Sequence, residues 1–370
     1  MKKNAFTLIE LLAVIVILAI IALIATPIIL GIINDSKEKS NERSIEMYAS
    51  AVKTSVAHHQ LLNNESITGK YTTSDGKILN GDVILIVEYN GDVICDTIVI
   101  FKDGNIYLNN CRVNGEDVEY IYGKENIPES VSFSTDSWET IVTNVQIGNF
   151  SKYKVGDTKE VSLTDFTNTA KEKGTFTVRI ANISSDDSIC KEEGYSQTAC
   201  GFVIEFVDII TEHNMNSRET NIGGWKDSEI RTYINKTIYD SLQIDLKENI
   251  IDTKVISGHD TLESKIYETM DKLYLLSAKE IKGQDLPSNE LTNNTANSRT
   301  RQLDYYKDQY ELTNNYLSTI KKYNENKKYW WLRSVGDLYS TVFNATDNLG
   351  NIGINFATDK RGVAPAFRIG

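Results

Sequence analysis

The feature that most constrains this chain is an apolar segment at its N-terminus. Residues 11–33 contain no charged side chain, and one carboxylate, Glu10, directly precedes them. These 23 residues are enough for a helix to cross ~30 Å of hydrocarbon. An acidic side chain at membrane depth costs roughly 2.5–3.5 kcal/mol on insertion scales, so Glu10 requires a role and a partner. Pro27 and Gly31 are tolerated in a membrane helix but bend or loosen it.

Three kinds of segment have this general character. A cleaved secretory signal has a shorter apolar core and an A-x-A site, and neither is present here. A plain signal anchor fits the length but leaves Glu10 unexplained. Directly upstream lie Lys2, Lys3 and the string AFTLI, which begins at Ala5. Together these residues resemble the N-terminus of a type IV prepilin, and that explanation covers the length, the basic leader and the carboxylate at once.

This resemblance implies a processing site and an assembly contact. Prepilin peptidase would cut between Ala5 and Phe6, and the Phe6 amine would then be N-methylated; the family more often has Gly at the position of Ala5. Glu10 lies one helical turn after Phe6 on the same face. The resemblance implies that its carboxylate meets the new terminus of an adjacent subunit and selects the axial register, and we place Pro27 with Glu10 in the assembly region. The alternative is an interfacial Glu10 that snorkels to water.

Beyond the apolar segment the helical periodicity continues to Leu62. Apolar positions spaced by three and four then lie on one face, namely Ile45, Tyr48, Val52, Val56 and His59. We therefore predict a leader at residues 1–5 and one helix of ~85 Å, with a membrane and filament-core part at 6–33 and an amphipathic part at 34–62. Strand patterns at 82–89, 92–101, 105–108 and 118–122, separated by Asn-Gly and Asp-Gly turns, predict a small antiparallel β head over 63–123.

The rest of the chain has the pattern of a larger mixed domain. Residues 124–130 are short and polar and are expected to be a linker, followed by a domain at 131–370. Helical patterns occur at 137–145, 228–235 and 238–249, strand patterns at 175–180, 202–210 and repeatedly from 329 to 369, and residues 285–326 are expected to be mostly loop with short helices. The predicted fold class is α+β.

A second resemblance covers most of residues 131–370. The strings ACGFVIEFVDIITEHNMN, DKLYLLSAKE, RQLDYYK, YWWLRSVG and GVAPAFRIG look like a bacterial surface-domain family of unassigned function. The resemblance implies a C-type-lectin-like fold, related to the formylglycine-generating and phage-receptor-binding proteins. It implies no particular ligand.

The four cysteines form two local couples, Cys95 with Cys111 and Cys190 with Cys200. Four cysteines allow three pairings, and the separation of the couples favours the two local ones. With the basic end of the helix inside, everything after it is outside, where disulfides persist. Neither couple has CxxC spacing or nearby histidines, so zinc is not expected. Free buried thiols are the alternative.

A polar, turn-rich stretch near the C-terminus is the candidate ligand site. Loops on a rigid scaffold that mix aromatic and amide side chains are common places for recognition. The candidate residues are Tyr339, Phe343, Asn344, Asp347, Asn348, Asn351 and Asn355. No string matches the EPN- or QPD-plus-WND pattern of calcium-dependent lectins, so neither a metal nor a cofactor is expected.

Charge and motifs narrow the function classes. The net charge is −12 and no basic cluster follows the first residues, which disfavours direct binding to nucleic acid. No GxSxG, HExxH or GxxxxGK[ST] string occurs, and the isolated histidines His213 and His259 and the adjacent pair His58-His59 carry no catalytic motif, so no enzyme activity is expected.

These observations predict a type IV pilin-like subunit, minor or at the tip of a filament, with a C-terminal recognition or adhesion domain. Its expected place is the cytoplasmic membrane, as a single-pass protein with the C-terminus outside, and then a cell-surface pilus. Its expected partners are prepilin peptidase, other pilin subunits, the membrane and a glycan or protein ligand. Two alternatives remain open: a pseudopilin of a type II-like secretion or DNA-uptake machine, and a surface-anchored enzyme of the formylglycine-generating-like fold.

Overall fold

The chain divides into two compact units, Met1–Ile127 and Pro128–Gly370. The computed structural model describes residues 8–64, 67–74, 76–80, 83–164, 174–183, 188–258, 266–283, 299–336 and 339–370. The boundary between the units falls inside the segment that the sequence marks as a linker. Because each unit has its own hydrophobic core, each is described separately.

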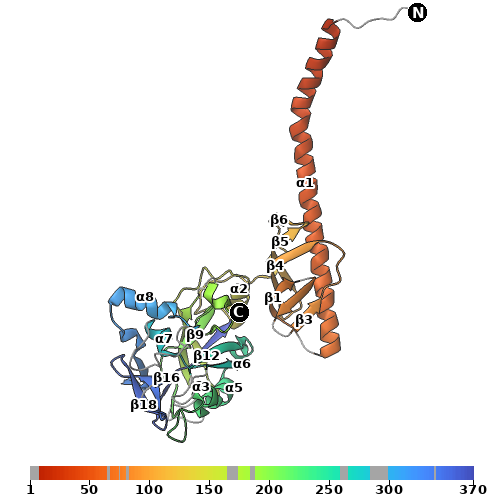
Figure 1. Ribbon diagram of the computed structural model, residues 1–370. Coiled ribbons are helices and arrows are strands. Elements are labelled where there is room, and N and C mark those ends of the chain that lie inside the picture. The colour runs from red at the N-terminus through yellow and green to blue at the C-terminus, as the bar shows by residue number, and fades with distance from the viewer. Residues whose placement is uncertain are drawn as a thin grey trace, which may run out of the picture. The chain divides into compact units, whose positions relative to one another are not determined.

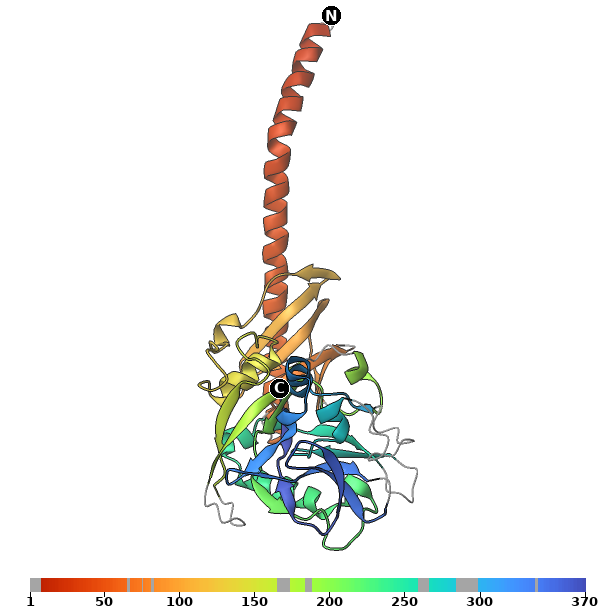
Figure 2. The ribbon, with the colours of Figure 1, turned by 90° about the vertical axis from the view of Figure 1, so that its left-hand side faces the viewer.

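The first unit is built on one long helix, α1 (Leu8–Asn63), drawn from red to orange in Figures 1 and 2. Its N-terminal part projects beyond the sheet of this unit as a bare rod, and its C-terminal part lies against that sheet. Buried side chains recur at helical spacing on the covered part, at Ile45, Tyr48, Ala49, Val52 and Val56. The helix ends where Asn64 adopts a left-handed conformation, which a short amide side chain tolerates.

A six-stranded antiparallel sheet covers the C-terminal part of α1 in the order β3-β2-β1-β4-β5-β6. Its strands are β1 (Gly69–Ser74), β2 (Lys77–Asn80), β3 (Val83–Ile86), β4 (Val93–Ile100), β5 (Ile106–Val113) and β6 (Glu116–Val118). β4 and β5 form the longest pair, with Cys95 opposite Cys111. Asn114 and Gly115, both with positive φ, form the tight turn between β5 and β6.

The second unit contains two five-stranded sheets, ordered β10-β19-β16-β17-β18 and β11-β20-β9-β8-β7, and two short hairpins, β12-β13 and β14-β15. The strands are β7 (Thr158–Ser162), β8 (Thr175–Asn182), β9 (Phe202–Phe206), β10 (Thr211–His213), β11 (Ile250–Ile251), β12 (Thr253–Ser257), β13 (Tyr267–Asp271), β14 (Lys321–Tyr323), β15 (Asn326–Lys328), β16 (Trp330–Val335), β17 (Val342–Thr346), β18 (Ile352–Phe356), β19 (Arg361–Val363) and β20 (Ala366–Ile369). β16 and β19 are parallel, and the other neighbouring strands of the two five-stranded sheets pair antiparallel within the described residues.

Short helices complete the second unit. They are α2 (Trp138–Gln146), α3 (Gly224–Asp227), α4 (Glu229–Tyr233), α5 (Tyr239–Ser241), α6 (Ile244–Lys247), α7 (Ala278–Lys282) and α8 (Asp304–Thr313), with the single turns η1 (Lys124–Asn126, in the first unit), η2 (Ser188–Lys191), η3 (Ile234–Ile238) and η5 (Leu317–Thr319). Ser137 caps α2 through the Thr140 N–H. The core includes all four tryptophans, which are fully buried.

The structure confirms the α+β class and adjusts several predicted elements. β1 and β2 were not predicted, because their polar Thr, Ser and Lys residues hide the alternation. The strand expected at 118–122 is β6, which ends at Val118. The helix expected at 238–249 is two short helices, α5 and α6, separated at Leu242, whose extended backbone interrupts the helix.

Candidate functional site

The N-terminal part of α1 is an exposed apolar surface. From Leu8 to Ile33 the large apolar side chains are exposed on all sides of the helix. This helix is long and apolar enough to cross a membrane. Glu10 lies in the first turn, where the positive end of the helix dipole favours a carboxylate. Ala5 and Phe6, the predicted cleavage and methylation positions, lie outside the described residues.

Pro27 lies inside the helix, toward the C-terminal end of this apolar segment. Proline has no backbone N–H, so it cannot donate to the carbonyl four residues before it. The neighbouring Thr26 hydroxyl donates to the Ala22 carbonyl at 2.6 Å and so supplies an additional bond to the same turn. The helix continues through this point to Asn63. Pro27 therefore removes one backbone hydrogen bond of the helix inside the apolar segment without ending the helix.

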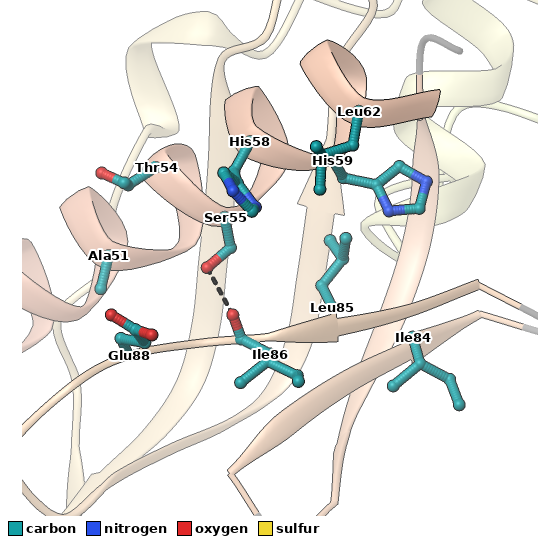
Figure 3. A pocket seen from close by; sticks show the side chains of 10 residues that line it. All are labelled: Ala51, Thr54, Ser55, His58, His59, Leu62, Ile84, Leu85, Ile86 and Glu88. Carbon is teal, nitrogen blue, oxygen red and sulfur yellow. Dashed lines mark hydrogen bonds between the residues drawn. The ribbon is translucent and has the colours of Figure 1, made fainter. Parts of the chain in front are cut away.

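A groove of about 530 Å³ lies at the other end of α1, between the helix and the edge strand β3 (Figure 3). Its lining residues are Ala51, Thr54, Ser55, His58, His59, Leu62, Ile84, Leu85, Ile86 and Glu88. The Ser55 hydroxyl donates to the Ile86 carbonyl at 2.7 Å, which joins the helix to the edge strand. Leu62, Ile84 and Ile86 are 71%, 54% and 66% exposed, whereas Leu85 is buried. The groove is therefore apolar, with a rim of hydroxyl, imidazole and carboxylate groups.

The sequence analysis did not predict this groove. Its signal was available in the four residues of β3, VILI, because a strand whose two faces are both apolar has more apolar surface than one sheet face can bury. The consecutive Leu61 and Leu62 at the end of α1 are a second signal, because the helix can turn only one of them toward its sheet.

Both expected disulfides are present. Cys95–Cys111 joins β4 to β5, and Cys190–Cys200 closes a loop before β9. Both Sγ atoms of the first bridge belong to the core of the first unit, since Cys95 and Cys111 are buried. The bridges are structural cross-links inside separate units.

Two buried ion clusters dominate the electrostatics of the second unit. In the first, Glu205 on β9 accepts from Arg179 at 2.8 Å, from Lys321 at 3.0 Å and from the Tyr306 hydroxyl at 2.8 Å. Burial alone would raise the pKa of Glu205, but Arg179 and Lys321 hold it below its ordinary value. Burial lowers the pKa of Lys321 to about 8, against the opposing attraction of Glu205.

In the second cluster, Glu280 on α7 accepts from both terminal nitrogens of Arg333, at 2.6 and 2.5 Å. Glu280 also completes a capping box with Ser277 at the start of α7. Burial alone would raise the pKa of Glu280, but Arg333 holds it below its ordinary value. Both carboxylates, Glu205 and Glu280, are fully buried and already accept hydrogen bonds from side chains of the same unit. The first cluster joins β9 to β8, β14 and α8, the second joins α7 to β16, and neither offers an accessible acid or base.

The structure separates the predicted ligand residues into two groups. Phe343 and Asn344 are fully buried in β17, and Asn355 on β18 is nearly so, so the prediction that these three lie on an exposed loop is wrong. Asn344 donates to the Val335 carbonyl at 3.4 Å, and Asn355 accepts from Arg361 at 2.8 Å. An amide that bonds to neighbouring groups can occupy a core strand, which a polarity pattern does not reveal.

Asp347, Asn348 and Asn351 belong to the turn between β17 and β18. Asp347 accepts from the Leu349 and Asn351 N–H groups at 2.8 Å, so its carboxylate holds the turn. Asn348 and Asn351 are exposed, and Tyr339 is 59% exposed. These three side chains are the most exposed part of the predicted set.

The histidines also belong to different units of the chain, His58 and His59 to the first and His213 and His259 to the second. His58 and His59 line the groove, and His213 stacks on Tyr233 with ring centroids 4.3 Å apart. His259 lies outside the described residues. Among the residues that the structure describes, no group of three or more His, Cys, Asp or Glu side chains could hold a metal ion.

Comparison with known proteins gives two family matches. Residues 1–26 match the prokaryotic N-terminal methylation motif, and residues 202–370 match a domain of unknown function (DUF6273). No curated protein and no solved structure matches the chain. The first match confirms the prepilin-type motif and supports a type IV pilin- or pseudopilin-like N-terminus. The second agrees with a domain of unassigned function, and the C-type-lectin-like fold stays a prediction.

Proposed function

We propose that this chain is a type IV pilin-like subunit, minor or at the filament tip. The observation that carries the proposal is the methylation motif at residues 1–26, followed directly by α1. The first half of α1 exposes apolar side chains on every side, while its second half packs under a sheet of its own unit. Such a helix suits a membrane before assembly and the apolar core of a filament afterwards.

In this proposal prepilin peptidase cleaves between Ala5 and Phe6, and the Phe6 amine is methylated. Glu10 then meets the amine of a neighbouring subunit, a charge pairing that lowers the cost of a carboxylate in an apolar environment. The chain is first a single-pass protein of the cytoplasmic membrane with both disulfide-bonded units outside, and then part of a cell-surface pilus. Two disulfides in separate units support this placement, because disulfides persist outside the cytoplasm.

The second unit serves as a non-enzymatic recognition or adhesion domain in this proposal. Its buried carboxylates are occupied by partners within the domain. Asn348 and Asn351 offer two exposed amides in the β17–β18 turn, and Tyr339 offers an exposed ring before β17, at the other end of that strand. A glycan or a protein surface is the class of ligand that such side chains recognise.

The first test is the intact mass of the N-terminus of the protein isolated from its native cells. A chain that starts at methylated Phe6 is expected. A chain that starts at unmodified Met1 contradicts the proposal.

A second measurement separates a pilus subunit from a pseudopilin of a secretion or DNA-uptake machine. Surface filaments are sheared from cells and compared with the membrane fraction by immunoblot. Recovery in the filaments supports the pilus subunit, and complete retention of a methylated chain in membranes supports the pseudopilin.

A further inference from the structure

We propose that a surface of the second unit, where α7, α8, η5 and the β17–β18 turn meet, binds a glycan of uncharged sugars. Its members are Lys282, Tyr310, Tyr316, Asn348 and Asn351, and we call it the tyrosine surface. The inference rests on the proposed function, because it specifies the ligand of the proposed recognition domain and the place where that ligand binds.

Four segments that are distant in sequence come together at this surface. The rings of Tyr310, in the last turn of α8, and Tyr316, just before η5, stack with centroids 4.7 Å apart and an interplanar angle of 23°. The ammonium of Lys282, the last residue of α7, lies 4.3 Å from the centroid of the Tyr316 ring. The Thr319 hydroxyl of η5 donates to the Gly350 carbonyl at 3.1 Å and so joins the β17–β18 turn to the same place.

The backbone around the two rings is fixed before any ligand binds. The Asn314 N–H donates to the Tyr310 carbonyl at 2.7 Å and ends α8, with Asn314 in the left-handed conformation. Gly350 also has positive φ, and a Cβ at this position would lie 2.6 Å from the Tyr316 carbonyl oxygen. Residue 350 must therefore be glycine for the turn to approach Tyr316 so closely. A surface that is already ordered loses less conformational entropy when it binds.

The aromatic part of the surface suits the apolar face of a sugar ring. Tyr310 is 37% exposed although its ring stacks on Tyr316, so part of the ring remains open to solvent. One face of many sugar rings presents only C–H groups, and such a face packs on an aromatic ring. Tyrosine also carries a hydroxyl, which bonds to polar groups at the edge of what it contacts.

The polar part of the surface suits the hydroxyls of the same sugar. Each sugar hydroxyl both donates and accepts, and the side-chain amide of asparagine also offers donors and an acceptor. Asn348 and Asn351 expose two such amides in the β17–β18 turn. The Lys282 ammonium adds a donor. Donors and acceptors beside an aromatic ring match an uncharged sugar, which brings both kinds of group together with an apolar face.

Two other classes of ligand fit this surface less well. A stable protein contact buries about 1,000 Å² or more and has an apolar centre. Here the exposed Leu317 and Leu349 are single side chains beside phenol, amide and ammonium groups. A polyanion requires several cations. Burial lowers the pKa of Lys282, and the Asp347 carboxylate is close enough to oppose that shift, so the same carboxylate would repel an anion.

The test is binding of the full chain, purified in detergent from its native cells, to immobilised oligosaccharides that end in glucose, galactose, mannose or N-acetylglucosamine. We expect the wild-type chain to bind at least one of them. Tyr310→Ala is expected to weaken the apparent affinity for that glycan at least tenfold, and Tyr310→Phe, which keeps the ring, to stay within threefold. Tyr339→Ala is the matched control and should stay within twofold, since Tyr339 is an exposed tyrosine at the other end of β17.

A second variant separates a lost contact from a disturbed fold. Asn348→Ala removes an exposed amide without touching the stacked rings and is expected to weaken binding at least threefold. The urea midpoint of each variant, followed by tryptophan fluorescence, is expected to match that of the wild-type chain, because Tyr310 and Asn348 are exposed.

Three results would overturn the inference: no binding of the wild-type chain to any of these sugars, unchanged binding by Tyr310→Ala and Asn348→Ala, or an equal loss in Tyr339→Ala. Failure of the proposed function is distinguishable from these results. The intact mass of the same purified chain would then lack methylated Phe6, and that measurement does not depend on the second unit.

Discussion

At the scale of single residues, the stability of the second unit depends on buried charges that are paired with one another. Replacing Arg333 by Met leaves the fully buried Glu280 without its main partner. Breaking a buried pair from one side costs about 3–5 kcal/mol of unfolding free energy. We expect a loss of that size in urea unfolding of the full chain in detergent, followed by tryptophan fluorescence, because all four tryptophans lie in the second unit.

Two further variants test whether the lost stability comes from the broken charge pair or from any replacement of arginine by methionine. Arg218 is exposed, so Arg218→Met is expected to stay within about 0.5 kcal/mol of wild type. The double variant Arg333→Met with Glu280→Gln removes both charges and should recover part of the lost stability. An Arg333→Met chain as stable as wild type would show that the pair contributes nothing.

The same carboxylates predict the effect of acid. Burial alone would raise the pKa values of Glu205 and Glu280, but Arg179 and Lys321 for the former and Arg333 for the latter hold both below the ordinary value of 4.5. The unfolded chain therefore binds protons at higher pH than the folded chain does. The stability from these groups is fully present above about pH 4.5 and is lost as the pH falls through the folded pKa values.

We accordingly expect the urea midpoint of the second unit to fall steadily between about pH 5 and pH 3. The double variant without Glu280 lacks one of the two contributions, so its midpoint should fall less over the same range. Equal slopes for the two proteins would contradict a role for Glu280.

At the scale of elements, Cys95–Cys111 is a cross-link between β4 and β5. It closes a loop with a sequence separation of 16, which corresponds to about 3 kcal/mol through restriction of the unfolded chain. Replacing both cysteines by Ala should increase hydrogen exchange in peptides of the first unit. The matched change at Cys190 and Cys200 lies in the other unit and should leave those peptides unchanged.

How far the sequence predicts an element depends on what satisfies its polar groups. α1, β4 and β5 follow from apolar periodicity and from turn residues such as Asn114 and Gly115, because these are local signals. Asn344 in β17 is different, since its place in the core depends on a partner supplied by the pairing of two strands, the Val335 carbonyl at the end of β16. The exposed Tyr339 and Asn348 were predictable from turn composition, but the groove at β3 required knowing that β3 is an edge strand.

At the scale of the whole molecule, α1 performs two tasks with one continuous helix. Its C-terminal half is the apolar cover of a sheet, and its N-terminal half has no cover in the described part of the chain. A membrane or the helices of other subunits can provide that cover, because both present apolar surface. Assembly therefore exchanges one apolar environment for another, and hydrophobicity alone does not set the position of a subunit along a filament.

A charge inside the apolar segment can set that position, and Glu10 is the candidate. We expect Glu10→Leu to remain membrane-bound and to carry methylated Phe6, because its helix is even more apolar. Its amount in sheared filaments should fall at least tenfold relative to wild type, as judged by immunoblot of filament and membrane fractions. Glu10→Asp keeps the charge with a shorter reach and should assemble better than Glu10→Leu. Normal assembly of Glu10→Leu would instead identify Glu10 as an interfacial carboxylate that snorkels to water, since such a group contributes no contact between subunits.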